Sequence, residues 1–220
     1  MKDTQTRKYE AFLRAQEFGD NNAARIPSET IADELFARLD EIIEQINNHS
    51  SIQSSGLRAA REGGTVKGVR RAELRTLLKS ISRTAKSIPT PGLSDRFRVP
   101  SRLKDQDLLS LGRSIAADAV PLRIEFIRRG LSTNFIDKLS TLVTNFEQAI
   151  DQMIQNEETR IAATAAIKDL FQVGMNLLRQ LDPIMRNVFV DDPATLAAWG
   201  SARHVERAPR SKRTGGAPTT

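Results

Sequence analysis

The stretch that decides the fold is IKDLFQVGMNLLRQLDPIMRNV, residues 167 to 188. Seven of its positions recur at alternating intervals of three and four residues. They are Ile167, Leu170, Gly174, Leu177, Leu181, Ile184 and Val188. This interval follows the 3.6-residue turn of an α-helix, so the seven positions share one stripe. We therefore predict a long helix with a seam of coiled-coil type, in which Gly174 lets another backbone approach closely.

The same interval recurs through most of the chain, and no segment alternates cleanly with period two. Helices are predicted over 28–61, 66–88, 104–129 and 133–190. Four long helices with short or medium connections pack most simply as an up-and-down bundle, so we predict an all-α fold with short terminal helices on the bundle. A single helical-bundle domain would cover residues 1–206, followed by a disordered basic tail over 207–220.

Glycine and proline mark the expected interruptions of these helices. Gly63 and Gly64 should separate the first two helices, and Pro121 should kink the third. Two boundaries stay open. The first helix could end near residue 47 instead of running on to 61, and the polar stretch 155–160 could interrupt the last.

Composition limits the class of protein. Of the 220 residues, 39% are apolar and only 5% aromatic, and Leu, Ile and Ala outnumber Val, which favours helices over a sandwich or barrel. The chain has no cysteine, its first residues are hydrophilic, and charges interrupt its most apolar region. We expect a cytoplasmic protein that does not enter a membrane.

Residues that could carry chemistry are few. The two histidines, His49 and His204, have no glutamate three residues before them, as a di-iron carboxylate site would require. Asp191 and Asp192 are adjacent carboxylates, but the capping of a short helix that begins at Pro193 accounts for them. We predict no catalytic, cofactor-binding or metal-binding residue, and therefore no enzyme.

Charge is the one unusual feature. The net charge is +6, yet residues 58–104 alone hold 13 Lys or Arg against 3 Asp or Glu. On a helix, the cations between 71 and 86 fall about 60° to 180° around the axis from Leu74, as one flank beside the core stripe. The adjoining proline-rich loop, 89–104, adds four more. The candidate anion-binding residues are Arg70, Arg71, Arg75, Lys79, Arg83, Lys86, Arg96, Arg98, Arg102 and Lys104.

Two functions and one structural explanation fit this flank. The first function is a non-enzymatic helical-bundle interaction or scaffolding protein, whose 167–188 seam could also pair with a second copy. The second is sequence-tolerant nucleic-acid binding through 67–104 and the tail, although only Phe97 offers a ring for base stacking. Alternatively, the acidic regions 28–61 and 105–200 could neutralise the flank within the chain.

Several stretches carry a resemblance that covers nearly the whole chain. They are LRAQEFGDNNAA, ISRTAKSI, PGLSDRFRVP and DDPATLAAWGSARHVERAPR. Together they resemble a recurrent group of bacterial, all-helical hypothetical proteins that have no assigned activity, cofactor or partner. The resemblance implies a bacterial cytoplasmic protein and transfers no functional residues.

Overall fold

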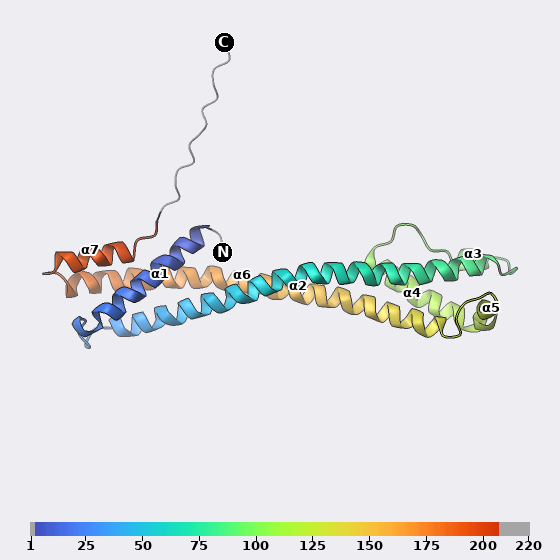
Figure 1. Cartoon of the computed structure of the whole chain (residues 1–220), viewed down its shortest axis with the longest axis horizontal. Coiled ribbons are helices and arrows are strands. Elements are labelled where there is room, and N and C mark those ends of the chain that lie inside the picture. The colour runs from blue at the N-terminus through green and yellow to red at the C-terminus, as the bar shows by residue number, and fades with distance from the viewer. Residues whose placement is uncertain (1–2, 207–220) are drawn as a thin grey trace, which may run out of the picture. The chain divides into compact units, whose positions relative to one another are not determined.

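The computed structural model describes residues 3–206, and every regular element in that range is helical (Figure 1). The elements, with η for a 3-10 helix, are α1 (Asp3–Asn22), η1 (Ala23–Arg25), α2 (Ala32–Lys86), α3 (Leu93–Arg96), α4 (Asp105–Ala119), η2 (Val120–Leu122), α5 (Arg123–Arg128), α6 (Phe135–Val188) and α7 (Pro193–Ala202). The predicted all-α class is confirmed. The predicted tail, 207–220, lies outside the described residues.

The chain forms two compact units. Within the described residues, the terminal unit comprises 3–53 and 161–206, and the central unit comprises Ser54–Arg160. Helices α2 and α6 contribute residues to both units. This division describes packing and does not measure cooperative unfolding. The single domain over 1–206 therefore stays a prediction.

The core of the terminal unit contains the apolar stripe predicted from the opening stretch, while the coiled-coil pairing of that stripe stays a prediction. Ile167, Leu177 and Leu181 are buried, and α1 lays its Phe12 ring against Phe171 with the ring centroids 5.8 Å apart. A Cβ atom on Gly174 would come within 2.5 Å of the Phe12 ring. Gly174 therefore admits an aromatic ring, and the prediction that a second backbone approaches there is wrong.

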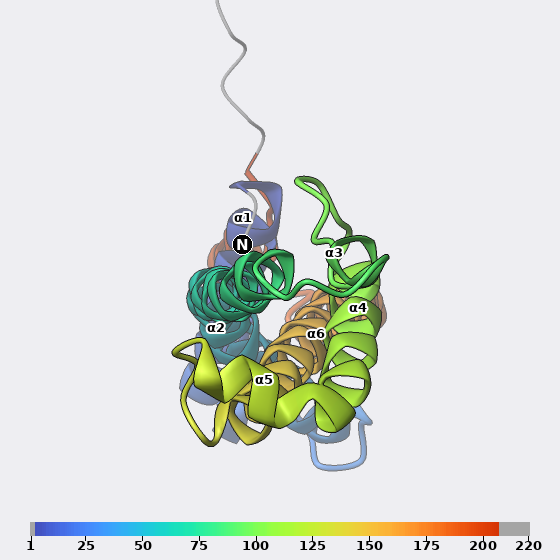
Figure 2. The same ribbon diagram turned by 90° about the vertical axis from the view of Figure 1, so that its right-hand side faces the viewer.

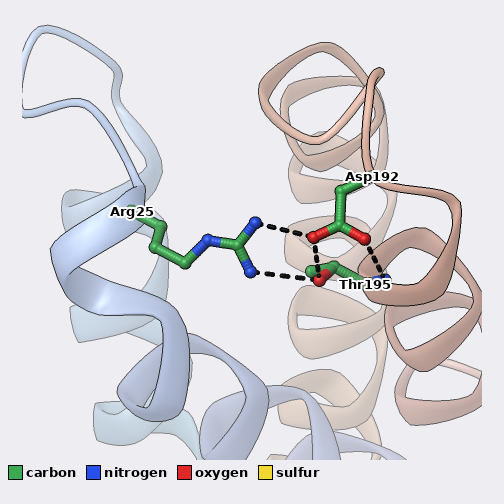
Figure 3. A network of polar contacts seen from close by, with 3 residues as sticks. All are labelled: Arg25, Asp192 and Thr195. Atoms are coloured by element: carbon green, nitrogen blue, oxygen red, sulfur yellow. Dashed lines mark hydrogen bonds and ion pairs between the residues drawn. The ribbon is translucent and has the colours of Figure 1, made fainter.

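Polar contacts hold the start of α7 within the terminal unit. Asp192 caps α7, as predicted, by accepting a hydrogen bond from the Thr195 backbone N–H at 3.0 Å. Figure 3 shows Arg25 reaching the same carboxylate and the Thr195 hydroxyl, at 2.7 and 3.1 Å. The Arg25 guanidinium also lies 4.9 Å from the centre of the Phe189 ring. One arginine thus joins η1 to the start of α7.

The central unit packs α4 against α2 and α6. Figure 2 shows α4 beside α6, with α5 turned across the end of α4. Leu74 and Leu78 of α2, Leu108 of α4 and Leu139 of α6 are fully buried in one core. Gly112 lets α4 approach α6 closely, since a Cβ atom there would lie 2.7 Å from Val143 Cγ2.

The predicted break at Gly63 and Gly64 is wrong, because both glycines lie inside α2, which is one continuous helix of 55 residues. Two glycines cost about 1 kcal/mol each in a helix. Ending and restarting the helix would instead leave four N–H and four C=O groups without helical partners. Met153 of α6 also packs 3.9 Å from the position of a Cβ atom on Gly63. Continuing the helix therefore costs less than interrupting it.

Pro121 has a larger effect than the predicted kink. The predicted helix over 104–129 becomes α4, η2 and α5, with Pro121 inside the 3-10 turn. Proline cannot donate a backbone hydrogen bond, and its ring clashes with the preceding helical turn. Gly130 then ends α5 at a φ of 92°, while the Leu131 N–H donates to the Phe126 carbonyl at 3.2 Å, which is a Schellman motif.

Helices α2 and α6 decide the two boundaries that the sequence left open. Helix α6 is continuous for 54 residues, so the polar stretch 155–160 is helical, and α2 continues past residue 47. The first two predicted helices are therefore one helix, and the third is divided into α4, η2 and α5. The predicted up-and-down bundle of four long helices is not confirmed.

Candidate functional site: a cationic hollow on α2

Three of the ten predicted cations come together on α2. Lys79, Arg83 and Lys86 are four and three residues apart, so they project from the same face over about 10 Å of helix. All three are exposed. Their side chains make no ion pair or hydrogen bond with any residue in the range 3–206. They are therefore cations whose charge the described part of the chain leaves unneutralised.

These cations line a depression of the surface that we call the cationic hollow. Its walls are Thr76, Lys79, Ser82, Arg83, Lys86 and Val99. Its volume is about 420 Å³. This volume lies within the range of small-ligand sites, roughly 300 to 1,000 Å³. Five of the six residues come from α2, and Val99 comes from the loop that follows α3.

The loop is held against α2 by other cations of the predicted set. Arg75 donates from Nη2 to the carbonyls of Pro100 and Ser101, at 3.2 and 2.7 Å. Arg71 donates to the Leu103 carbonyl and pairs with Asp105. These bonds fasten the wall that carries Val99, so Arg71 and Arg75 position the hollow and are not themselves free to bind a ligand.

Lys67 and Arg71 share one acidic partner at the start of α4. The Lys67 Nζ atom lies 3.1 Å from Asp105 Oδ2, and Arg71 pairs with Oδ1 of the same carboxylate. Arg70 pairs with Glu73 on its own helix at 3.0 Å. The single continuous flank predicted from helical angles is therefore divided. Its first part serves structural contacts, and only its second part is free.

Cations of the loop are divided in the same way. Arg96 donates to Asp118, and this hydrogen bond raises the pKa of the Arg96 guanidinium. Arg98, Arg102 and Lys104 are exposed and have no partner among the described residues. Phe97 is fully buried and packs on Phe126 with centroids 5.2 Å apart, so it cannot stack on a nucleic-acid base.

Acidic residues of the chain neutralise some of the predicted cations and leave others without a partner among the described residues. Acids of the 105–200 region do neutralise part of the flank, through Asp105 and Asp118. Among residues 3–206, no acid of the 28–61 region pairs with a predicted cation. Neutralisation accounts for Arg70, Arg71 and Arg96, and leaves Lys79, Arg83 and Lys86 unexplained.

Ser82 also lines the hollow, although the sequence analysis did not name it as a candidate. Its spacing from the cations could have revealed it. Ser82 is three residues after Lys79 and four before Lys86, and it lines the hollow with them. It is the only polar residue among those classed as buried in the described chain, at 8% exposure. Thr76 and Thr84, on the same helix, donate their hydroxyls to the Ala72 and Ser80 carbonyls, whereas Ser82 makes no such bond within residues 3–206.

A second, larger groove lies on a neighbouring face between α2 and α6. Its volume is about 730 Å³, and Val69, Leu77 and Leu142 are among its lining residues. Arg70 and Glu73 in its wall pair with each other, and Lys138 is its one lining cation without an ion pair among the described residues. The groove thus has one unpaired cation, whereas the cationic hollow has three.

Residues 3–206 contain no group of three His, Asp or Glu side chains that could hold a metal ion. None of the helices in that range has both the length and the apolar character needed to cross a membrane. No protein family, curated protein or solved structure matches this chain.

Proposed function

We propose that this protein is a non-enzymatic interaction protein that binds an anionic partner through the cationic hollow. One observation carries the proposal. Lys79, Arg83 and Lys86 line one concave site and have no acidic partner in the described chain. Like charges on one helix face repel each other, so their clustering is unfavourable unless an anion binds there.

The position of the hollow supports a binding role. Three of the neighbouring cations are used to fasten the 98–104 loop and α4, which gives the hollow a second wall before any ligand arrives. A site that is already ordered loses less conformational entropy on binding. The hollow therefore has both the charge and the preorganisation that an anion site needs.

The test is a titration with heparin at about 50 mM and about 200 mM salt, since an electrostatic complex weakens steeply as salt rises. We expect the wild-type protein to bind at low salt. The triple variant Lys79→Gln, Arg83→Gln and Lys86→Gln should lose most of this binding and keep its melting temperature, because these side chains make no ion pair or hydrogen bond within the described fold.

A matched control removes the same charge elsewhere. Arg38, Arg58 and Lys168 are exposed, have no ion pair in the described residues and do not line the hollow. Their replacement by glutamine should leave most heparin binding intact. Equal losses in the two triple variants would mean that net charge alone attracts the polymer, and the proposal would fail.

A second candidate is sequence-tolerant nucleic-acid binding through 67–104. It is favoured by the three further free cations of the loop, Arg98, Arg102 and Lys104, which could contact successive phosphates. Buried Phe97 argues against single strands, which are usually bound by stacking. For duplex DNA, the hollow's three cations should contribute about −2.7 to the slope of log K against log salt, at about −0.9 per contact.

We also propose the setting in which this binding occurs. The absence of cysteine and the resemblance to bacterial helical proteins support a bacterial cytoplasmic protein. If the protein is a scaffold, we expect its anionic partner to be another protein or a second copy of this chain. Dimerisation through the 167–188 seam is not favoured, since Ile167, Leu177 and Leu181 are already buried within the terminal unit.

A further inference from the structure

The ligand class of the hollow follows from its charge, and this step rests on the proposed function. Lys79, Arg83 and Lys86 offer three positive charges to one site. A carboxylate or a phosphodiester carries a single negative charge, whereas a phosphate monoester carries about −1.5 to −2 at neutral pH. Of these three groups, the monoester most nearly balances the cations.

Ser82 gives the hollow a hydroxyl beside its cations. It lines the hollow, and its side chain makes no hydrogen bond with the described part of the chain. The hydroxyl oxygen reaches solvent, since it is not one of the fully buried polar atoms that lack a partner. It is therefore available to donate to an anion that enters the hollow.

The remaining walls fit the group that carries the phosphate. The volume of about 420 Å³ exceeds what one phosphate needs. Val99 lies in the opposite wall and packs partly into the central core, so it offers an apolar contact that does not move freely. Arg75 holds the two residues after Val99 by their carbonyls.

We propose that the cationic hollow binds a phosphate monoester, with Lys79, Arg83, Lys86 and Ser82 as ligands of the phosphate and Val99 against the group that bears it. The three cations of the hollow span only about two turns of α2, which suits one compact group better than a long polymer. A phosphodiester strand is accordingly the competing outcome of the test.

The experiment follows amide chemical shifts of the whole isotopically labelled chain during titration with phenyl phosphate. Benzoate serves as the carboxylate probe, and a thymidine dinucleotide serves as the phosphodiester. We expect saturable shifts at residues 76–86 and at Val99 with phenyl phosphate. Benzoate and the dinucleotide should bind roughly tenfold more weakly, because each carries less negative charge than the monoester.

Ser82→Ala tests the site without changing its charge. Alanine is the best helix former and is smaller than serine, so the variant should fold. The loss of one hydrogen bond should weaken phenyl phosphate roughly two- to tenfold. Ser80→Ala is the matched control, because Ser80 belongs to the apolar groove and not to the hollow. This control should bind phenyl phosphate as the wild type does.

The outcomes separate this inference from the proposed function. Heparin binding that depends on the three cations, without phenyl phosphate binding or without an effect of Ser82→Ala, would overturn the monoester site alone. Equal affinity for the dinucleotide would also overturn it and would favour nucleic acid. If the triple glutamine variant still bound both heparin and phenyl phosphate as the wild type does, both proposals would be overturned.

A further arm identifies the source of the monoester. A tetrapeptide that contains phosphoserine gains contacts along its backbone, whereas a free small ester does not. Tighter binding of the peptide than of phenyl phosphate would support a phosphorylated protein partner. Equal binding would support a small phosphate ester, and the absence of both would contradict the site.

Discussion

At the scale of single residues, the terminal unit depends on a few close fits and on one acidic cap. Gly174 leaves room for the Phe12 ring, and Gly19 leaves similar room for Phe36, where a Cβ atom would lie 2.8 Å from the ring. Glycine is required at these positions because a side chain would occupy the space of the ring. Its backbone freedom plays no part, since neither residue has a positive φ.

We predict that Gly174→Ala lowers the free energy of unfolding by about 1 to 3 kcal/mol, because the added methyl group overpacks the core against Phe12. Gly200→Ala is the control, since a Cβ atom on Gly200 meets nothing within 4 Å. Urea unfolding curves measure both. A stability of Gly174→Ala equal to that of the control would contradict the close fit.

Asp192 gives a prediction about pH. Hydrogen bonds from Arg25 and from Thr195 hold the pKa of the Asp192 carboxyl well below its ordinary value. A carboxyl whose pKa is lower in the folded state stabilises the fold above its unfolded pKa, near 3.9, and loses that contribution as the pH falls further. Asp192→Asn keeps a good helix cap but cannot titrate.

The stability of the wild type should therefore fall more steeply than that of Asp192→Asn between about pH 4 and pH 2. Unfolding midpoints in urea at several pH values measure the difference. Arg25→Gln should give a pH dependence between those of the wild type and Asp192→Asn, since it removes the hydrogen bond from Arg25 but leaves those from Thr195. Parallel curves for wild type and Asp192→Asn would contradict this account.

At the scale of elements, glycine acts in opposite ways in α2 and after α5. Gly64 lies within a continuous helix, and a Cβ atom there would meet nothing within 4 Å. Gly130 has a φ of 92°, which a residue with a side chain adopts only with strain. The same residue type thus weakens one element and ends another.

Two alanine substitutions should consequently have opposite signs. Gly64→Ala should raise the free energy of unfolding by about 0.5 to 1 kcal/mol through helix propensity. Gly130→Ala should lower it by about 1 to 2 kcal/mol, because alanine is strained in the left-handed region. Thermal unfolding followed by circular dichroism compares them. Destabilisation by Gly64→Ala would indicate that α2 does not continue through this position.

At the scale of the whole molecule, the open question is cooperativity. The terminal and central units have separate apolar cores. Helices α2 and α6 nevertheless contribute to both, so the unfolding of one unit would leave new helix ends with unsatisfied backbone groups. This cost favours a single transition, in keeping with the predicted single domain.

Two core variants test this expectation. Leu39 is fully buried in the terminal core and Leu108 in the central core. Replacement of either by alanine should cost about 2 to 5 kcal/mol and shift one common transition in calorimetry. Two transitions, of which each variant moves only one, would show that the units unfold independently.

The sequence by itself determined the helical class and the core stripes. Ile167, Leu177 and Leu181 are buried as their spacing predicts, because helical periodicity is a local property. The cap at Asp192 and the end of a helix near residue 129 were also predicted, since each depends on a few neighbouring residues. Only two boundaries at glycine and proline were misread, where local preference competes with the energy of an uninterrupted helix.

Tertiary structure alone decided which cations are free. Arg75 and Lys79 are four residues apart and project from the same face of α2. Arg75 nevertheless binds loop carbonyls, whereas Lys79 lines the hollow. The partners of Arg71 and Arg96 are more than 20 residues away along the chain, at Asp105 and Asp118. Neutralisation of a charge depends on distance in space, and helical spacing specifies only the face from which a side chain projects.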